Sequence, residues 1–203
     1  MGTSDPIERI AGLLDACNDL QAVVDAALGC GLRLTGADRG NLQLMDWKLR
    51  SLTIAAHRGF DSDFLDRFAR VNARDGTACG RTIREGRCVI VEDVFADPEF
   101  APHQAIADQV GFRAVQSTPL ISGSGAFLGV LSTHFSARHR ARAHEIRALK
   151  TLAEITATAI ILQRIRVAQQ ANDQVRIADS LAAVDKSWEL LGRASRKVQK
   201  LVP

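Results

Sequence analysis

Chemistry in this chain would depend on polar side chains that interrupt apolar stretches. His134 stands near the end of the run LGVLSTHF, and an imidazole can donate or accept a hydrogen bond and change its charge near neutral pH. The alternative for this residue is a structural histidine, hydrogen-bonded to a loop. Five further interruptions are candidates for ligand binding, with a solvated or hydrogen-bonded sheet residue as the alternative at each: Asn41, Gln43, His57, Gln116 and Thr118.

A second group combines carboxylates with a histidine. Glu92 and Asp93 close an apolar run, and His103 follows in a polar segment. Such residues can act as acid and base or hold a metal ion, but an acidic pair at a strand end more commonly caps a turn or meets an arginine. The sequence has no GxxxxGKS/T, GxGxxG or HExxH motif. We therefore predict neither a catalytic nor a metal site.

The four cysteines, Cys17, Cys30, Cys79 and Cys88, form no CxxC pair and have no histidine at a zinc-ligand spacing. Free thiols in a reducing compartment are the expected state. No apolar run approaches the roughly 18 residues of a membrane span, and the N-terminus lacks the pattern of a signal peptide. The sequence therefore predicts a cytoplasmic protein without a membrane partner.

Charge is spread unevenly although the formal net charge is only +3. Acidic residues are in excess up to about residue 137, and basic residues are in excess beyond it. A basic tail can bind nucleic acid, but this one is diluted with Ala, Gln and Leu and lacks interleaved aromatic residues. A solvated helix face is the preferred interpretation, and no nucleic-acid partner is predicted.

Periodicity predicts the elements that position the candidate residues. Residues 6–37 have apolar side chains at helical spacing and should form two helices, with Asn18 or Asp19 capping the second and Gly36 ending it. In residues 40–60, apolar and polar side chains alternate as in strands, and this pattern is typical of a hairpin.

A short helix capped by Asp61 should follow the hairpin, and residues 76–87 should form a loop with a helical turn. Three further strands are expected at 87–94, 112–122 and 126–136, with a polar segment at 96–109 before the last two. In the last strand, alternation places Leu128, Val130, Ser132 and His134 on one face.

No Gly or Pro occurs between about Ala143 and Gly192, which permits one very long helix or two in succession. The apolar face of residues 146–162 should pack on the sheet. Beyond it, apolar residues recur at alternating steps of 3 and 4, interrupted only by Ser195: Ile177, Leu181, Val184, Trp188, Leu191, Val198 and Val202. This is a coiled-coil-like seam. A lone amphipathic helix gains little stability in water, so we predict a homodimer.

The order of these elements and the amino-acid sequences of six segments resemble GAF domains of bacterial sensor histidine kinases and related signalling proteins. The segments are GNLQLMD, AHRGF, GTACG, VIVEDV followed by DPEF, GFRAVQSTPL and LGVLSTHF. The resemblance covers about residues 18–163, preceded by an N-terminal helix at 1–17 and followed by a signalling or dimerisation helix at 164–203.

The resemblance implies an α+β GAF fold. We expect a central antiparallel sheet of five or six strands, with the N- and C-terminal helices packed on one face and a ligand pocket on the other. Related phytochrome GAF domains carry a histidine at the position that matches His134, which favours a pocket position for this residue. Four residues are expected to form the apolar walls of the pocket: Phe64, Phe68, Cys79 and Ile90.

Two specialised branches of the family can be compared with these residues. Bilin-binding members attach their chromophore through a cysteine before the fourth strand, and the segment FAPHQAIADQVG has none. Noncovalent tetrapyrrole or haem binding stays open. The free methionine-R-sulfoxide reductases have a Cys-Gly pair similar to Cys79 and Gly80, but their catalytic cysteine also has no counterpart in that segment.

The resulting hypothesis is a non-catalytic sensory module that binds a small molecule and relays its state through the terminal helices. Its output partner would be a histidine kinase or another signalling protein, because no histidine follows His144 and no ATP-binding motif is present. The alternatives are a methionine sulfoxide reductase and a dimerisation scaffold without ligand. Neither a cofactor nor the identity of the ligand can be predicted.

Overall fold

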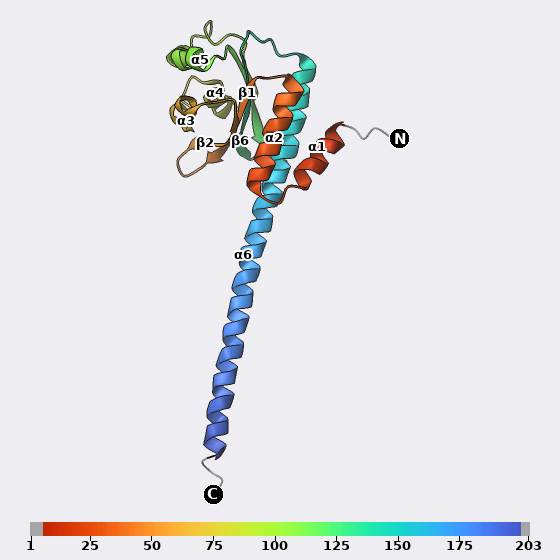
Figure 1. Cartoon of the computed structure of the whole chain (residues 1–203), viewed down its shortest axis with the longest axis vertical. Helices are drawn as coiled ribbons and strands as arrows, with labels where there is room; N and C mark the ends of the chain where they lie inside the picture. The colour runs from red at the N-terminus through yellow and green to blue at the C-terminus, as the bar shows by residue number, and fades with distance from the viewer. Residues whose placement is uncertain (1–5, 200–203) are drawn as a thin grey trace, which may run out of the picture. The chain divides into compact units, whose positions relative to one another are not determined.

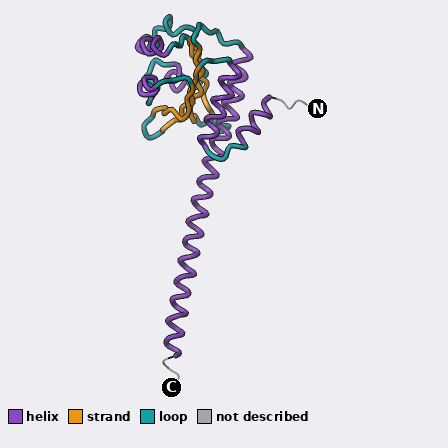
Figure 2. The backbone as a smooth tube through the Cα atoms, in the orientation of Figure 1, coloured by secondary structure: helices purple, strands orange, loops and turns teal. Residues whose placement is uncertain are grey.

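The computed structural model describes the backbone of residues 6–199, with side chains described for 8–178, 180 and 181. Contacts divide the chain into one unit that ends at Gln163 and a second that begins at Arg164. All strands and all helices except the later part of the last one belong to the first unit, which is shown in Figures 1 and 2.

A six-stranded antiparallel sheet forms the centre of the first unit, in the order β3-β2-β1-β6-β5-β4. The strands are β1 (Arg39–Asp46), β2 (Ser51–Arg58), β3 (Arg70–Val71), β4 (Val89–Val91), β5 (Ala114–Ile121) and β6 (Phe127–Phe135). Asn41 lies opposite Ser132, and Ser132 lies opposite Ser117, so β1, β6 and β5 place a row of polar residues across the middle of the sheet. The expected α+β fold is confirmed.

Helices cover both faces of the sheet (Figure 1). They are α1 (Pro6–Asp15), α2 (Leu20–Thr35), α3 (Ser62–Arg67), α4 (Ala78–Glu85), the 3-10 helix η1 (Ala101–His103), α5 (Gln104–Val110) and α6 (Ala143–Gln199). Two of the predicted caps are present: Asp19 accepts a hydrogen bond from the Ala22 amide, and Asp61 accepts one from the Phe64 amide. Gly36 ends α2 in the left-handed conformation, where glycine has no steric penalty.

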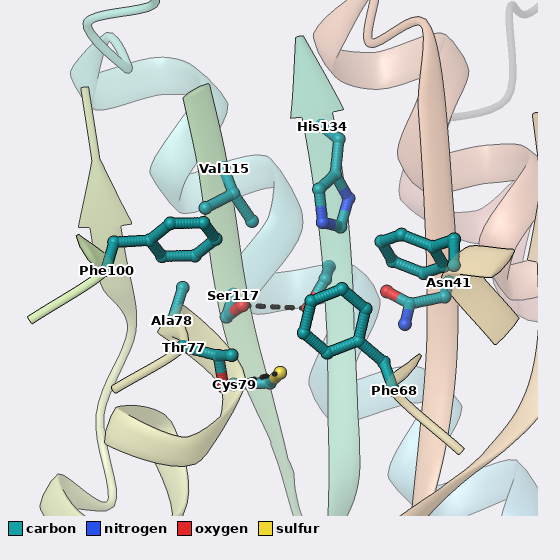
Figure 3. A pocket seen from close by; sticks show the side chains of 11 residues that line it. Asn41, Phe68, Thr77, Ala78, Cys79, Phe100, Val115, Ser117 and His134 are labelled. Carbon is teal, nitrogen blue, oxygen red and sulfur yellow. Dashed lines mark hydrogen bonds between the residues drawn. The ribbon is translucent and has the colours of Figure 1, made fainter. Parts of the chain in front are cut away.

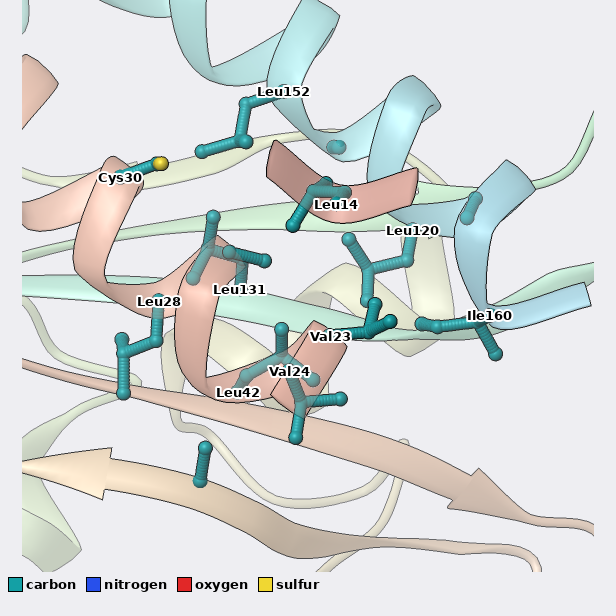
Figure 4. Close-up of a cluster of buried hydrophobic side chains, with 14 of the residues drawn as sticks. Leu14, Val23, Val24, Leu28, Cys30, Leu42, Leu120, Leu131, Leu152 and Ile160 are labelled. Atoms are coloured by element: carbon teal, nitrogen blue, oxygen red, sulfur yellow. The ribbon is translucent and has the colours of Figure 1, made fainter. Parts of the chain in front are cut away.

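One face of the sheet packs against α2 and the first part of α6, as Figure 4 shows. We call it the helix face. Its buried cluster consists of aliphatic side chains and one cysteine: Leu14, Val23, Val24, Ala27, Leu28, Cys30, Leu42, Ala56, Leu120, Leu128, Leu131, Leu149, Leu152, Ala153, Ala157 and Ile160. At about 25 cal/mol per Å² of buried apolar surface, this layer is a main source of stability for the first unit.

The other face, called the cavity face, packs against α3, α4, η1 and α5. Its buried cluster contains five phenylalanines: Phe60, Phe64, Phe68, Phe100 and Phe112. The segment between β4 and β5 crosses this face and forms η1 and α5, which the polar composition of residues 96–109 did not predict. The two-residue strand β3 was also not predicted, because two residues carry no periodicity.

A β-bulge between β5 and β6 corrects the predicted face of one residue. The register shifts at Leu120 and Ile121, and Leu128 lies opposite the shift. Leu128 therefore joins the helix-face cluster while Val130 joins the cavity-face cluster. Simple alternation had placed the two on the same face, and an extra residue in one strand reverses that assignment.

The second unit is the continuation of α6. Ile177 and Leu181, the first two positions of the predicted seam, are 60% and 61% exposed. The side chains of the other seam positions lie outside the described residues.

Candidate functional site

A small cavity lies on the cavity face, between the middle of the sheet and the layer of α3, α4 and η1 (Figure 3). Strands β1, β5 and β6 form its floor, and the helical layer forms its roof. It is lined by Asn41, Phe64, Phe68, Thr77, Ala78, Cys79, Phe100, Val115, Ser117, Ser132 and His134. The polar row across the sheet thus forms the floor of a cavity.

The cavity is small in this conformation. Its volume is about 20 Å³, and about 10–15 Å³ on the same measure is needed to hold one water molecule. A larger molecule can enter only if side chains of the roof, such as Phe68 and Phe100, move outward.

His134 stands at one end of the cavity and is surrounded by aromatic rings. Its ring centroid is 4.9 Å from that of Phe112 and 5.0 Å from that of Phe60, and both pairs meet edge to face. Burial lowers the pKa of His134 to about 3, and the nearby Arg39 guanidinium contributes to the same shift. The ring is therefore neutral at physiological pH, as expected, and its Nδ1 atom has no hydrogen-bond partner.

Asn41 contributes a second unpartnered polar atom. Its side chain is 2% exposed, and its Oδ1 atom accepts no hydrogen bond within the protein. By contrast, the hydroxyl groups of Ser117 and Ser132 are 2.8 Å apart and bond to each other. Buried polar atoms without partners cost free energy, so Asn41 and His134 are the groups that a ligand could satisfy.

The first turn of α4 forms part of the roof. Thr77 caps this helix by accepting a hydrogen bond from the Gly80 amide, and the Cys79 sulfur lies 3.4 Å from the Thr77 hydroxyl. Burial raises the pKa of the Cys79 thiol. The cap fixes Ala78 and Cys79 against the cavity, and burial favours the neutral form of the thiol although its contact with Thr77 acts in the opposite direction.

Two arginines link chain segments around the cavity. Arg39 donates to the carbonyl oxygens of Gly59 and Gly111, at 3.0 and 2.9 Å, and so ties the end of β2 to the end of α5. Arg81 on α4 contacts Asp97 before η1 at 2.8 Å. Neither arginine lines the cavity.

The sequence of this chain matches a family model described as GAF domain over residues 17–161. The chain belongs to the GAF domain family. No curated protein matches it in sequence.

Several solved structures share the fold of this GAF domain. A domain from Sinorhizobium meliloti 1021, described as part of a two-component sensor histidine kinase, is 21% identical with a TM-score of 0.63, and the match covers 76% of this chain and 99% of that one. Free methionine-R-sulfoxide reductase from Neisseria meningitidis, solved with its substrate, is 21% identical with a TM-score of 0.66, covering 82% of this chain and 96% of that one. A bacteriophytochrome from R. palustris is 16% identical with a TM-score of 0.64, covering 84% of this chain but only 40% of that one.

Five of the predicted ligand-binding residues line the cavity of this GAF domain: Asn41, Phe64, Phe68, Cys79 and His134. Gln43 lies on β1 two residues after Asn41. It is fully buried, and both of its amide atoms lack partners, but it does not line the cavity.

The other four predicted ligand-binding residues do not line this cavity. His57 is exposed at the end of β2. Ile90 points away from Val89 and Val91, which belong to the cavity-face cluster, because neighbouring strand residues face opposite sides. Gln116 and Thr118 lie on the helix face, where Gln116 donates to the Cys88 sulfur at 3.6 Å.

Six lining residues were not predicted as site residues: Thr77, Ala78, Phe100, Val115, Ser117 and Ser132. Ser132 shares a predicted strand face with His134, so alternation could have identified it. In β5, Gln116, Ser117 and Thr118 are all polar, and polarity alone could not decide which of them faces the cavity. Phe100 comes from a segment predicted as loop.

The carboxylates and histidine of the second group form no joint site. Asp93 contacts Arg113 at 3.1 Å and also pairs with Arg138, as expected for an acidic pair that meets arginines. His103 lies against Phe68 and Phe100, and burial lowers its pKa. In the part of the chain that the structure describes, no three His, Cys, Asp or Glu residues cluster as a metal site would require.

The same described part contains no helix that is both long and apolar enough to span a membrane.

Proposed function

We propose that this GAF domain is a non-catalytic sensory module whose ligand binds in the cavity between the sheet and the layer of α3, α4 and η1. The observation that carries this proposal is the pair of buried, unpartnered atoms at the cavity, Asn41 Oδ1 and His134 Nδ1. A ligand that satisfies them removes a cost that the closed structure bears. The ligand also has to displace the roof, because the closed cavity holds about one water molecule.

A chain of polar contacts connects the segment that follows β4 to the residues that precede α6. The Val94 amide donates to the Arg113 carbonyl, while Asp93 pairs with Arg113 and Arg138. The His139 amide then donates to the Glu92 carbonyl at 3.2 Å. We infer that a shift of the segment after β4 alters this contact with the residues that precede α6.

The start of α6 is itself held by Glu145. Its carboxylate accepts a hydrogen bond from the Arg142 amide at 2.9 Å and lies 3.2 Å from His139 Nε2. The relay requires two arrangements of these contacts and a ligand that prefers one of them. The output partner is proposed to be a histidine kinase or another signalling protein.

The later part of α6 is proposed to pair with a second copy of the chain. Ile177 and Leu181 are more than half exposed, and a single helix with an exposed apolar seam gains stability by forming a coiled coil. Light scattering on the full chain and on a chain ending at Gln163 tests this point. A full-length chain that is monomeric at micromolar concentration would contradict it.

Native mass spectrometry of the purified full chain, combined with an absorbance scan, tests ligand binding. We expect a bound compound, or a rise in melting temperature with one member of a metabolite library, that is lost in His134→Ala and kept in His57→Ala. His57 is the matched control because its ring is exposed on a neighbouring strand. If no compound copurifies and none shifts the melting temperature, the module is a scaffold without ligand.

A reductase function is the second candidate, because the fold is shared with the Neisseria reductase over most of both chains. The positions of the thiols disfavour a reductase function. Cys79 lines the cavity, whereas Cys88 lines a groove on the helix face with Thr118 and Lys150. Burial raises the pKa of both thiols, which disfavours the thiolate that attacks a sulfoxide.

A further inference from the structure

The chemistry of the cavity lining restricts the kind of ligand that it can hold. Among the described residues that line it, none carries a charge, since His134 is neutral and the rest are amide, hydroxyl, thiol or apolar side chains. An ion moved from water into such a site without a partner loses several kcal/mol or more of hydration free energy. The lining therefore disfavours a phosphate, a carboxylate or an ammonium group.

Three arginines on the elements around the cavity are engaged in contacts outside it. Arg39, whose charge acts on His134, donates to two backbone carbonyls. Arg81 is paired with Asp97, and Arg67 lies 3.4 Å from His103 Nδ1. An anionic ligand would have to break one of these contacts to find a counter-charge.

The first turn of α4 provides a positive feature at the cavity wall. A helix N-terminus carries roughly half an elementary charge, which suits a carbonyl oxygen or a ring nitrogen but does not balance a full negative charge. The Asp75 carboxylate is also close enough to raise the pKa of Cys79, and it would repel an anion at this end. An uncharged acceptor atom fits better here.

The opposite requirement holds at Asn41, whose unpartnered atom is an oxygen and hence an acceptor. A ligand must bring an N–H or O–H group to it. Phe64, Phe68 and Phe100 also line the cavity, and Figure 3 labels the last two. Aromatic walls favour a flat, apolar body that can stack on or abut their rings.

We propose that the ligand is a small uncharged aromatic molecule that carries one hydrogen-bond donor, directed to Asn41 Oδ1, and one acceptor, which serves the first turn of α4 or, in the tautomer protonated there, His134 Nδ1. This assignment rests on the proposed function, because it requires that the cavity opens for a ligand at all.

Three probes of nearly equal size separate the requirements: benzamide has the donor and the acceptor, acetophenone lacks the donor, and benzoate is an anion. Binding to the full chain is followed by amide NMR shifts of Ala78, Cys79, Ser117 and Ser132. We expect benzamide to shift these signals at millimolar concentration, acetophenone to bind about tenfold more weakly, and benzoate to leave them unchanged.

Variants test whether Asn41 is the residue that requires a hydrogen-bond donor on the ligand. Asn41→Leu should lower the affinity for benzamide about tenfold and abolish the preference over acetophenone. His57→Leu, on the strand paired with β1, should change neither, because His57 is exposed. The probe series on the unmodified chain remains decisive if Asn41→Leu does not fold.

The outcomes distinguish the two levels of the proposal. Benzoate binding as tightly as benzamide, or acetophenone binding as tightly as benzamide, overturns the assigned ligand class and leaves ligand binding intact. If none of the three probes shifts the cavity signals up to its solubility limit, the assigned ligand class is wrong, whereas the proposed function is overturned only if no compound copurifies and no member of the metabolite library shifts the melting temperature.

Discussion

The two faces of the same sheet are packed in different ways. On the helix face, the buried cluster is aliphatic, and the side chains of α2 and α6 interdigitate with those of β1 and β6. On the cavity face, five buried phenylalanines cover the sheet, and they leave a cavity beside His134 and Asn41. The helix-face cluster is formed by flexible aliphatic side chains, whereas the rings around His134 meet edge to face.

This difference assigns separate tasks to the faces. The helix face holds the terminal helices on the sheet and supplies stability. On the cavity face, Asn41 Oδ1 and His134 Nδ1 are buried without partners beside a cavity, which costs stability and is where we propose that a ligand binds. Stability and the proposed ligand binding thus depend on different residues of the same three strands, and each can be tested separately.

The largest effect is expected from a deletion on the helix face. Leu131 is fully buried between the sheet and the helices, so Leu131→Ala should lower the free energy of unfolding by about 2–5 kcal/mol. Urea denaturation measures this change. The exposed Leu49→Ala is the control and should cost less than about 0.5 kcal/mol. A cost below about 1 kcal/mol for Leu131→Ala would show that this face is not closely packed.

Acid should destabilise the protein through the cavity face. The unfolded His134 ring binds a proton below its ordinary pKa of 6.5, but the folded ring does so only near pH 3. Between these values the unfolded state binds more protons, so stability falls as the pH falls, by about 1.4 kcal/mol per pH unit. At pH 4.5 the contribution of His134 amounts to about 3 kcal/mol.

Urea denaturation of the wild type and His134→Phe between pH 7 and pH 4 tests this expectation. The variant should lose stability more slowly on acidification, while His57→Phe should follow the wild type. Parallel curves for the wild type and His134→Phe would mean that the folded ring takes up its proton as readily as the unfolded one.

A smaller effect of opposite sign is expected at Asn41. Asn41→Leu removes a buried acceptor without a partner, so it should raise the free energy of unfolding by about 1 kcal/mol in the absence of ligand. On the helix face, Thr156 donates to the Leu152 carbonyl at 2.7 Å, and Thr156→Val should give no such gain. A clear loss of stability for Asn41→Leu would indicate that its amide is satisfied in the folded protein.

The smallest effect is expected from the cysteines. Cys79 and Cys88 lie on different faces, so they cannot share one reaction site without rearrangement. Incubation with free methionine sulfoxide and a thiol reductant should give no turnover above blank, for the wild type as for Cys79→Ser. Turnover that disappears in Cys79→Ser would establish the reductase function instead.

Strong local patterns allowed most of the elements to be predicted. The hairpin of β1 and β2 follows from strand alternation, and the caps Asp19 and Asp61 mark the starts of α2 and α3 because short oxygen-bearing side chains bond the first free amides of a helix. The helical roof over residues 101–110 was not predicted, because its amphipathic pattern is short and polar. Its helices depend on packing against the sheet.

The site was predicted only where polarity and alternation agreed. Asn41 was identified as a polar interruption of an apolar strand, and His134 through strand alternation together with the resemblance to phytochrome GAF domains. In β5, three consecutive residues are polar, so their polarity does not show which of them faces the cavity. Gln116 and Thr118 were predicted to do so, but Ser117 is the one that lines it. The bulge between β5 and β6 places Leu128 on the face opposite to the one that alternation predicts.

The sequence by itself determined the order of the main elements, the GAF family and the residue types available to a ligand, because these depend on spacing along the chain. Only the tertiary structure decided which polar residues share the cavity, how little space it encloses and which charges lie outside it. These properties arise from strand register and from the packing of distant segments. The free energy of burying each side chain depends on neighbours that are far away in sequence.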